Sequence, residues 1–170
     1  NSPIVEPELG DIIRDQVRAG RLLATRETAD AVQLTDLILV CVGTPSLPNG
    51  SIDLTYVRRV SAEIGAALKD HPGAPVVVVR STVLPGTTRD VVIPALEAGS
   101  GHEAGVTFGV CFNPEFLREG TAVRDFYDPP KTVIGEFNRA SGELLASKLY
   151  AGLPGPMLRT DIETAEMVTY

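Results

Sequence analysis

The chain of 170 residues is 44% hydrophobic and 22% charged, and its formal net charge is -7. This composition indicates a globular domain with a buried core rather than a disordered segment. The acidic balance argues against nucleic acid as a partner, because phosphate binding needs clustered cations. The longest apolar run, residues 37–42, is far shorter than the roughly 20 residues of a membrane-spanning helix. We therefore expect a cytoplasmic protein that binds neither nucleic acid nor membranes.

Hydrophobic residues recur at helix or strand spacing along the whole chain. In chain order we expect helices over 8–22 and 25–34, a strand over 36–42, a helix over 54–68, a strand over 75–79, a helix from 87 to about 98, a strand over 106–112, a helix begun by Pro114, a strand over 132–135, a helix over 140–149 and a last helix from Asp161. Strands that alternate with helices indicate βαβ units. The predicted class is therefore α/β, with a doubly wound and largely parallel sheet.

The first three predicted strands are each followed by a loop with polar residues. These loops contain Gly43-Thr44-Pro45, Arg80-Ser81-Thr82, and Asn113-Pro114-Glu115 leading to Glu119. In a parallel sheet all three loops lie at the edge where ligands bind. Hydroxyl groups, backbone N–H groups and helix N-termini suit a phosphate or ribose ligand at this edge.

Simpler explanations exist for the same residues. Thr44 and Thr82 can cap turns. Asn113 is expected to be the N-cap of the helix that follows it, with Glu115 in the first turn. Glu115 and Glu119 are four residues apart and would share a helix face. That face is either a solvated acidic surface, or a pair in which repulsion raises one pKa for acid–base catalysis. Spacing alone does not decide between them.

The cysteines and histidines give no sign of a nucleophile or a metal site. Cys41 and Cys111 lie in apolar, strand-like runs, so we expect buried, reduced thiols. His71 and His102 lie in loops without partners at metal-ligand spacing, and we predict no metal. The chain also has no G-x-G-x-x-G turn for a dinucleotide phosphate. The residues alone thus indicate part of a nucleotide-binding domain.

Four blocks, in the same order, resemble the family of UDP-glucose and GDP-mannose dehydrogenases. They are residues 3–9 (PIVEPEL), 41–45 (CVGTP) followed by Asn49-Gly50 and Asp53-Leu54, 80–87 (RSTVLPGT) and 113–120 (NPEFLREG). The resemblance implies a partial Rossmann-like NAD-binding domain at 1–160 that lacks its glycine-loop half. Residues 161–170 would begin a central helix. We therefore expect a fragment of a longer enzyme, which by itself is inactive because the family's nucleophilic cysteine is not in the chain.

The resemblance implies an NAD-dependent, four-electron oxidation of the C6 alcohol of a nucleotide sugar to the acid. Residues 2–7, 80–86, 128–130 and 132–135 are closer to the GDP-mannose branch, so conversion of GDP-mannose to GDP-mannuronate for polysaccharide synthesis, as in alginate, is expected. UDP-glucose oxidation is the alternative within the family. A non-catalytic module that binds nucleotides or partners is the alternative of another class. The complete protein would be a homodimer or a larger homo-oligomer.

The resemblance also implies roles for individual positions. Cofactor-binding residues would be Gly43, Thr44, Pro45, Ser81, Thr82 and Glu119. Substrate-binding residues would be Glu115, Phe116, Leu117, Arg118 and Glu119. The catalytic group would comprise Thr82, which helps to hold the catalytic water, together with Glu115 and Glu119, which assist hydrolysis of the thioester intermediate. Thr169 stands where the family usually has a lysine that stabilises an oxyanion.

Overall fold

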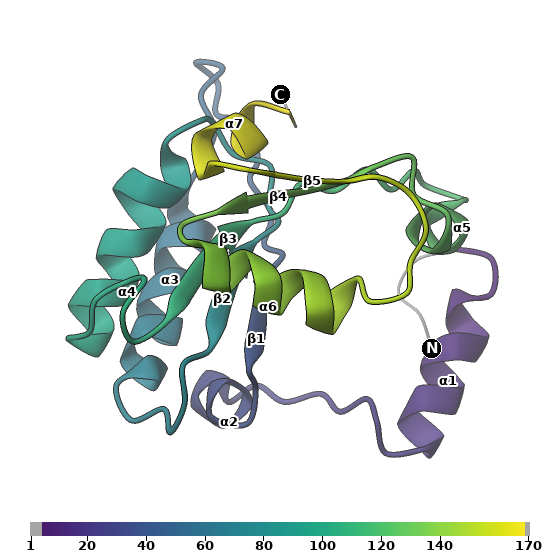
Figure 1. Ribbon diagram of the computed structural model, residues 1–170, viewed down its shortest axis with the longest axis horizontal. Coiled ribbons are helices and arrows are strands. Elements are labelled where there is room, and N and C mark those ends of the chain that lie inside the picture. The colour runs from purple at the N-terminus through teal and green to yellow at the C-terminus, as the bar shows by residue number, and fades with distance from the viewer. Residues whose placement is uncertain (1–4, 169–170) are drawn as a thin grey trace.

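A five-stranded sheet lies at the centre of the protein in a computed structural model that describes residues 5–168 (Figure 1). The strands follow one another across the sheet in chain order: β1 (Leu37–Val40), β2 (Val76–Val79), β3 (Gly109–Phe112), β4 (Thr132–Glu136) and β5 (Met157–Thr160). The β1–β2, β2–β3 and β4–β5 pairs are parallel, whereas β4 runs antiparallel to β3. The prediction of a largely parallel sheet is confirmed.

Helices surround the sheet, and one turn of π-helix, η1, directly precedes α4. They are α1 (Leu9–Arg18), α2 (Thr28–Gln33), α3 (Thr55–Leu68), η1 (Thr88–Val92), α4 (Ile93–Ser100), α5 (Ala122–Tyr127), α6 (Arg139–Leu149) and α7 (Ile162–Met167). In Figure 1, α3 and α4 lie on one side of the sheet and α6 on the other, while α1 stands apart beside α5. No helix of residues 5–168 is long and apolar enough to cross a membrane.

The alternating side chains of β2 supply two hydrophobic cores. Val77 and Val79 pack with residues of α3, α4 and α7, whereas Val76 and Val78 pack with residues of α6. All four are 3% exposed or less, which explains why this strand reads as a continuous apolar run. Helices on both faces of the sheet confirm the doubly wound arrangement.

The chain beyond β3 departs from the prediction at two places. No helix begins at Pro114, because residues 113–118 are irregular and α5 starts at Ala122. The strand β5 was not predicted, since it is short and largely exposed at the edge of the sheet. The last helix, α7, begins at Ile162 with Asp161 as its N-cap, and the Asp161 carboxylate accepts a hydrogen bond from the Thr164 N–H at 2.8 Å.

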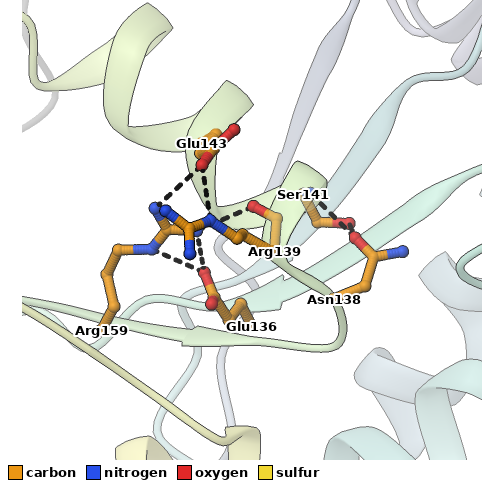
Figure 2. A network of polar contacts seen from close by, with 6 residues as sticks. All are labelled: Glu136, Asn138, Arg139, Ser141, Glu143 and Arg159. Atoms are coloured by element: carbon orange, nitrogen blue, oxygen red, sulfur yellow. Dashed lines mark hydrogen bonds and ion pairs between the residues drawn. The ribbon is translucent and has the colours of Figure 1, made fainter.

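Two close contacts fix β5, α6 and α7 around β4. A Cβ built on Gly135 of β4 would lie 2.6 Å from the Cβ of Ala165, so α7 packs directly on this strand. Figure 2 shows the second contact, in which Arg159 of β5 donates to Glu136 at 2.7 Å and to the carbonyl oxygen of Arg139 at 2.7 Å. Because β4 is antiparallel to β3, Glu136 at the carboxyl end of β4 lies opposite Cys111 within β3 and not opposite the loop that follows β3.

Candidate functional site

The loops after β1 and β2 are joined by side-chain hydrogen bonds at one edge of the sheet. The hydroxyl of Thr44 donates to the carbonyl oxygen of Thr82 at 2.7 Å. The hydroxyl of Ser81 donates to the carbonyl oxygen of Val42 at 2.6 Å. Parallel pairing of β1 with β2 places both loops at the same end, as the topological rule requires. Thr44 therefore bridges two loops instead of capping its own turn.

The surface of these two loops leaves room for a ligand at Gly43. Gly43, Pro45 and Thr82 are exposed, whereas Ser81 is buried and its hydroxyl is bonded within the protein. A Cβ built on Gly43 would have no protein atom within 4 Å, and Gly43 has no positive φ. Neither backbone strain nor packing among the described residues therefore requires glycine here. Glycine also permits close approach of a ligand to the backbone, which makes Gly43 a candidate contact residue.

The loop after β3 is organised by buried hydrogen bonds and not by a helix. Asn113 is 1% exposed, and its side-chain N–H donates to the carbonyl oxygen of Val133 at 2.8 Å. Asn113 is therefore not an N-cap, and the expected helix face shared by Glu115 and Glu119 is wrong. Both glutamates are exposed on an irregular loop instead.

A buried carboxylate holds the second half of this loop. Asp125 of α5 accepts hydrogen bonds from the guanidinium of Arg118, at 3.0 Å and 2.8 Å, and from the backbone N–H of Arg118 at 3.1 Å. The Arg118 guanidinium holds the pKa of the Asp125 carboxyl well below its usual range. The N–H of Gly120 donates to the Glu6 carboxylate at 2.8 Å, which ties the loop to the segment before α1. Arg118 is thus already engaged within the protein.

The other predicted substrate-binding residues lie in different surroundings. Phe116 is half-buried against the core, and the ammonium of Lys131 lies 4.8 Å from the centre of its ring. Leu117 and Glu115 line an apolar groove of about 380 Å³ between α1 and α5. The structure therefore places Glu115 and Leu117 at the same groove, whereas Phe116 packs against the core.

One residue of the edge was named in the sequence analysis as part of the loop after β2 but was given no role. Arg80 follows β2 directly, and its side chain is only 10% exposed. Its guanidinium donates to the side-chain oxygen of Asn113 and, at 2.9 Å, to the hydroxyl of Tyr150. It also lies 3.6 Å from the Glu115 carboxylate. The sequence signal that could have identified Arg80 is its charge directly after a run of four valines.

The cysteines behave differently from each other. Cys111 is buried in β3, and burial raises its pKa to about 12. Cys41 is exposed, contrary to the prediction, because it follows β1 at the edge of the sheet. Burial of its thiol still raises its pKa, while Arg80 opposes this shift. In the part of the chain that the structure describes, no group of three or more His, Cys, Asp or Glu residues is arranged to hold a metal ion.

Comparison with known proteins agrees with this architecture. The family model described as "UDP-glucose/GDP-mannose dehydrogenase family, NAD binding domain" matches residues 1–153. The chain belongs to this family. The family prediction is confirmed, and NAD is the cofactor of the matched domain.

The relatives in this family are longer than the chain. It is 53% identical over 169 residues to GDP-mannose 6-dehydrogenases of Pseudomonas savastanoi pv. phaseolicola and Azotobacter vinelandii, which covers 99% of this chain and 38% of each relative. A UDP-glucose 6-dehydrogenase of Bacillus subtilis, TuaD, is 36% identical, over 99% of this chain and 35% of the relative. The chain thus spans about two fifths of the length of the curated relatives it matches.

A solved structure shows the same fold throughout the chain. The ternary complex of GDP-mannose dehydrogenase from Pseudomonas aeruginosa matches with a TM-score of 0.97 and 49% identity, covering 100% of this chain and 39% of that one. The Rossmann-like fold of an NAD-binding domain is therefore confirmed. Thr169, the position of the expected lysine, lies outside the described residues.

Proposed function

We propose that this chain is the NAD-binding part of an enzyme that oxidises GDP-mannose to GDP-mannuronate. The choice of GDP-mannose as substrate rests on the difference in sequence identity. The chain is 49% to 53% identical to GDP-mannose 6-dehydrogenases, against 36% to 38% for UDP-glucose 6-dehydrogenases. The family match favours an enzyme over a non-catalytic binding module. UDP-glucose remains the second candidate substrate within the family.

The residues at the sheet edge suit NAD as a bound group. In this proposal the bare backbone of Gly43 lets the cofactor approach closely, and exposed Pro45 borders the same surface. Thr44 holds the first loop against the second, which presents Thr82 toward cofactor and substrate. Glu119, exposed on the third loop, completes the cofactor side. Bound NAD supplies the hydride acceptor for the oxidation.

The carboxylates supply the proton chemistry in this proposal. Oxidation of a C6 alcohol to a carboxylate removes four electrons and takes one oxygen from water. A base must remove a proton from that water, and a carboxylate within hydrogen-bond reach can do so. Glu115 lies beside the groove between α1 and α5, where it can contact substrate. We assign it this role, with Thr82 orienting the water and Glu119 assisting.

The test is the activity of the full-length protein that contains this chain. With GDP-mannose and NAD it is expected to form two NADH per sugar, with a higher kcat/KM than with UDP-glucose. The reverse preference would transfer the proposal to UDP-glucose, and no NADH with either sugar would refute it. Replacing Glu115 by Gln or Thr82 by Ala should slow turnover. Glu27→Gln, an exposed carboxylate before α2, serves as the matched control.

We further propose that the full-length protein is a cytoplasmic homo-oligomer. Cys41 and Cys111 are both free thiols, which suits a reducing compartment. Light scattering of the purified protein tests the assembly, and a monomer at micromolar concentration would contradict it.

A further inference from the structure

The sheet edge contains a buried cation that the proposed chemistry does not yet use. Arg80 is 10% exposed, and its backbone N–H donates to the carbonyl oxygen of Val40 at 2.9 Å, which continues the β1–β2 ladder. A buried guanidinium destabilises a fold unless hydrogen-bond acceptors and a counter-charge surround it. The polar and charged partners of the Arg80 side chain therefore indicate its role.

Two neutral groups fix the Arg80 guanidinium in place. It donates to the side-chain oxygen of Asn113 and to the hydroxyl of Tyr150, and that hydroxyl itself donates to Asn113 at 2.5 Å. Asn113 is anchored in turn by its hydrogen bond to the carbonyl oxygen of Val133 in β4. The orientation of Arg80 is thus set by the residue after β3, a residue of β4 and the residue after α6. None of these partners carries a negative charge.

The counter-charge comes from Glu115. Its carboxylate lies 3.6 Å from the second terminal nitrogen of Arg80, and its side chain is 51% exposed. Exposed ion pairs contribute little when both side chains must be ordered to form them. Here Arg80 is already ordered by Asn113 and Tyr150, so only Glu115 loses conformational freedom. The pair therefore restrains the half-exposed Glu115 carboxylate at the groove between α1 and α5.

We propose that Arg80 is a positioning residue that holds the Glu115 carboxylate in place for the reaction. This inference rests on the proposed function, because it assigns a task to a residue that acts through Glu115. Misplacement of a reacting group by about 1 Å commonly slows catalysis on the order of a hundredfold. Loss of Arg80 should therefore lower kcat and leave the KM for NAD nearly unchanged.

A double-mutant cycle in the full-length protein separates positioning from a structural role. We expect Arg80→Gln to lower kcat about 10- to 100-fold. In a Glu115→Gln background the same change should have almost no further effect, because the group that Arg80 positions has been removed. Arg80→Lys retains the charge and should recover part of the lost rate. Multiplicative effects in the double variant, or an unchanged kcat in Arg80→Gln, would overturn the proposal.

A second arginine provides the matched control. Arg159 is 28% exposed and also has ionic and carbonyl partners, but it lies in the network of Figure 2, which contains none of the residues assigned to the candidate site. Arg159→Gln should lower the melting temperature and leave kcat unchanged. If Arg80→Gln does not fold, Tyr150→Phe removes one anchor of the guanidinium while leaving Glu115. Its smaller loss of kcat should also vanish in the Glu115→Gln background, and persistence there would contradict the proposal.

Crystal structures make the test independent of the proposed function. Should the full-length protein oxidise neither sugar nucleotide, the parent and the Arg80→Gln variant can still be compared. We expect an ordered Glu115 carboxylate beside Arg80 in the parent, and a displaced or disordered one in the variant. The same ordered position of Glu115 in both structures would refute the inference.

Discussion

Replacing Gly43 by alanine should weaken NAD binding without harming the fold. The new methyl group would meet no protein atom within 4 Å, and Gly43 has no positive φ. Alanine at such a position stabilises a protein by about 0.4–1 kcal/mol, because it restricts the unfolded chain. In a domain the size of this chain each kcal/mol shifts the melting temperature by roughly 2–4 °C, and the shift is smaller in the longer full-length protein. We therefore expect a melting temperature that is equal to the parent's or a few degrees higher.

The expected loss of cofactor affinity follows from the same empty space. If NAD packs against the bare backbone, the methyl group crowds it at a cost of about 1–3 kcal/mol. That range corresponds to a dissociation constant roughly 5- to 150-fold larger. Titration calorimetry of NAD into the full-length protein, with thermal unfolding in parallel, measures both quantities.

A matched glycine in α1 serves as the control for this experiment. A methyl group added at Gly10 would likewise meet no protein atom within 4 Å, so Gly10→Ala should raise the melting temperature and leave NAD affinity unchanged. An unchanged dissociation constant in Gly43→Ala would place the cofactor elsewhere. A clear fall in the melting temperature of the Gly43→Ala variant would show that the space beside Gly43 is filled by protein.

Three further predictions concern the fold and its titrating groups. Gly135→Ala would place a methyl group 2.6 Å from the nearest side-chain carbon of α7, so thermal unfolding should show a loss of about 1–3 kcal/mol; an unchanged melting temperature would contradict this packing. Arg118 lowers the pKa of Asp125 below its ordinary 3.8, so Asp125 stabilises the protein above that pH and ceases to do so as pH falls toward the folded-state pKa. Urea unfolding of Asp125→Asn should therefore show lower stability at neutral pH and a shallower decline in acid, and an equally steep decline would be a negative result. Iodoacetamide at mildly alkaline pH should modify exposed Cys41 and spare Cys111, as peptide mass spectrometry can check; modification of both would contradict the burial of Cys111.

The elements that the sequence predicts well are those buried on both faces. The valine run of β2 gives an unambiguous pattern because every side chain is excluded from water. β5 has the sequence MLRT and is largely exposed, so neither alternation nor a continuous apolar run identifies it. Its strand conformation comes from pairing with β4, a tertiary contact that local sequence does not encode.

The candidate site was predictable in its location but not in its internal contacts. The parallel topology alone placed the three loops at one edge. Asn113 followed by proline has the local pattern of a helix start, yet its side chain is used by Arg80 and Tyr150. Those partners lie 33 and 37 positions away in the chain, so no spacing rule could reveal them. For this reason the helix predicted to begin at Pro114 does not form.

The antiparallel pairing of β4 with β3 allows the segment between them to diverge independently of the sheet. β3 ends and β4 begins at the same edge, so residues 113–131 leave that edge and return to it. A connection between parallel strands must instead cross a whole face of the sheet and help to cover it. Insertions or deletions within residues 113–131 would therefore reshape the surface of the candidate site while every strand keeps its register. Because Phe116 and Phe126 pack against the two hydrophobic cores, such changes are best tolerated at the exposed residues 118–121 between them.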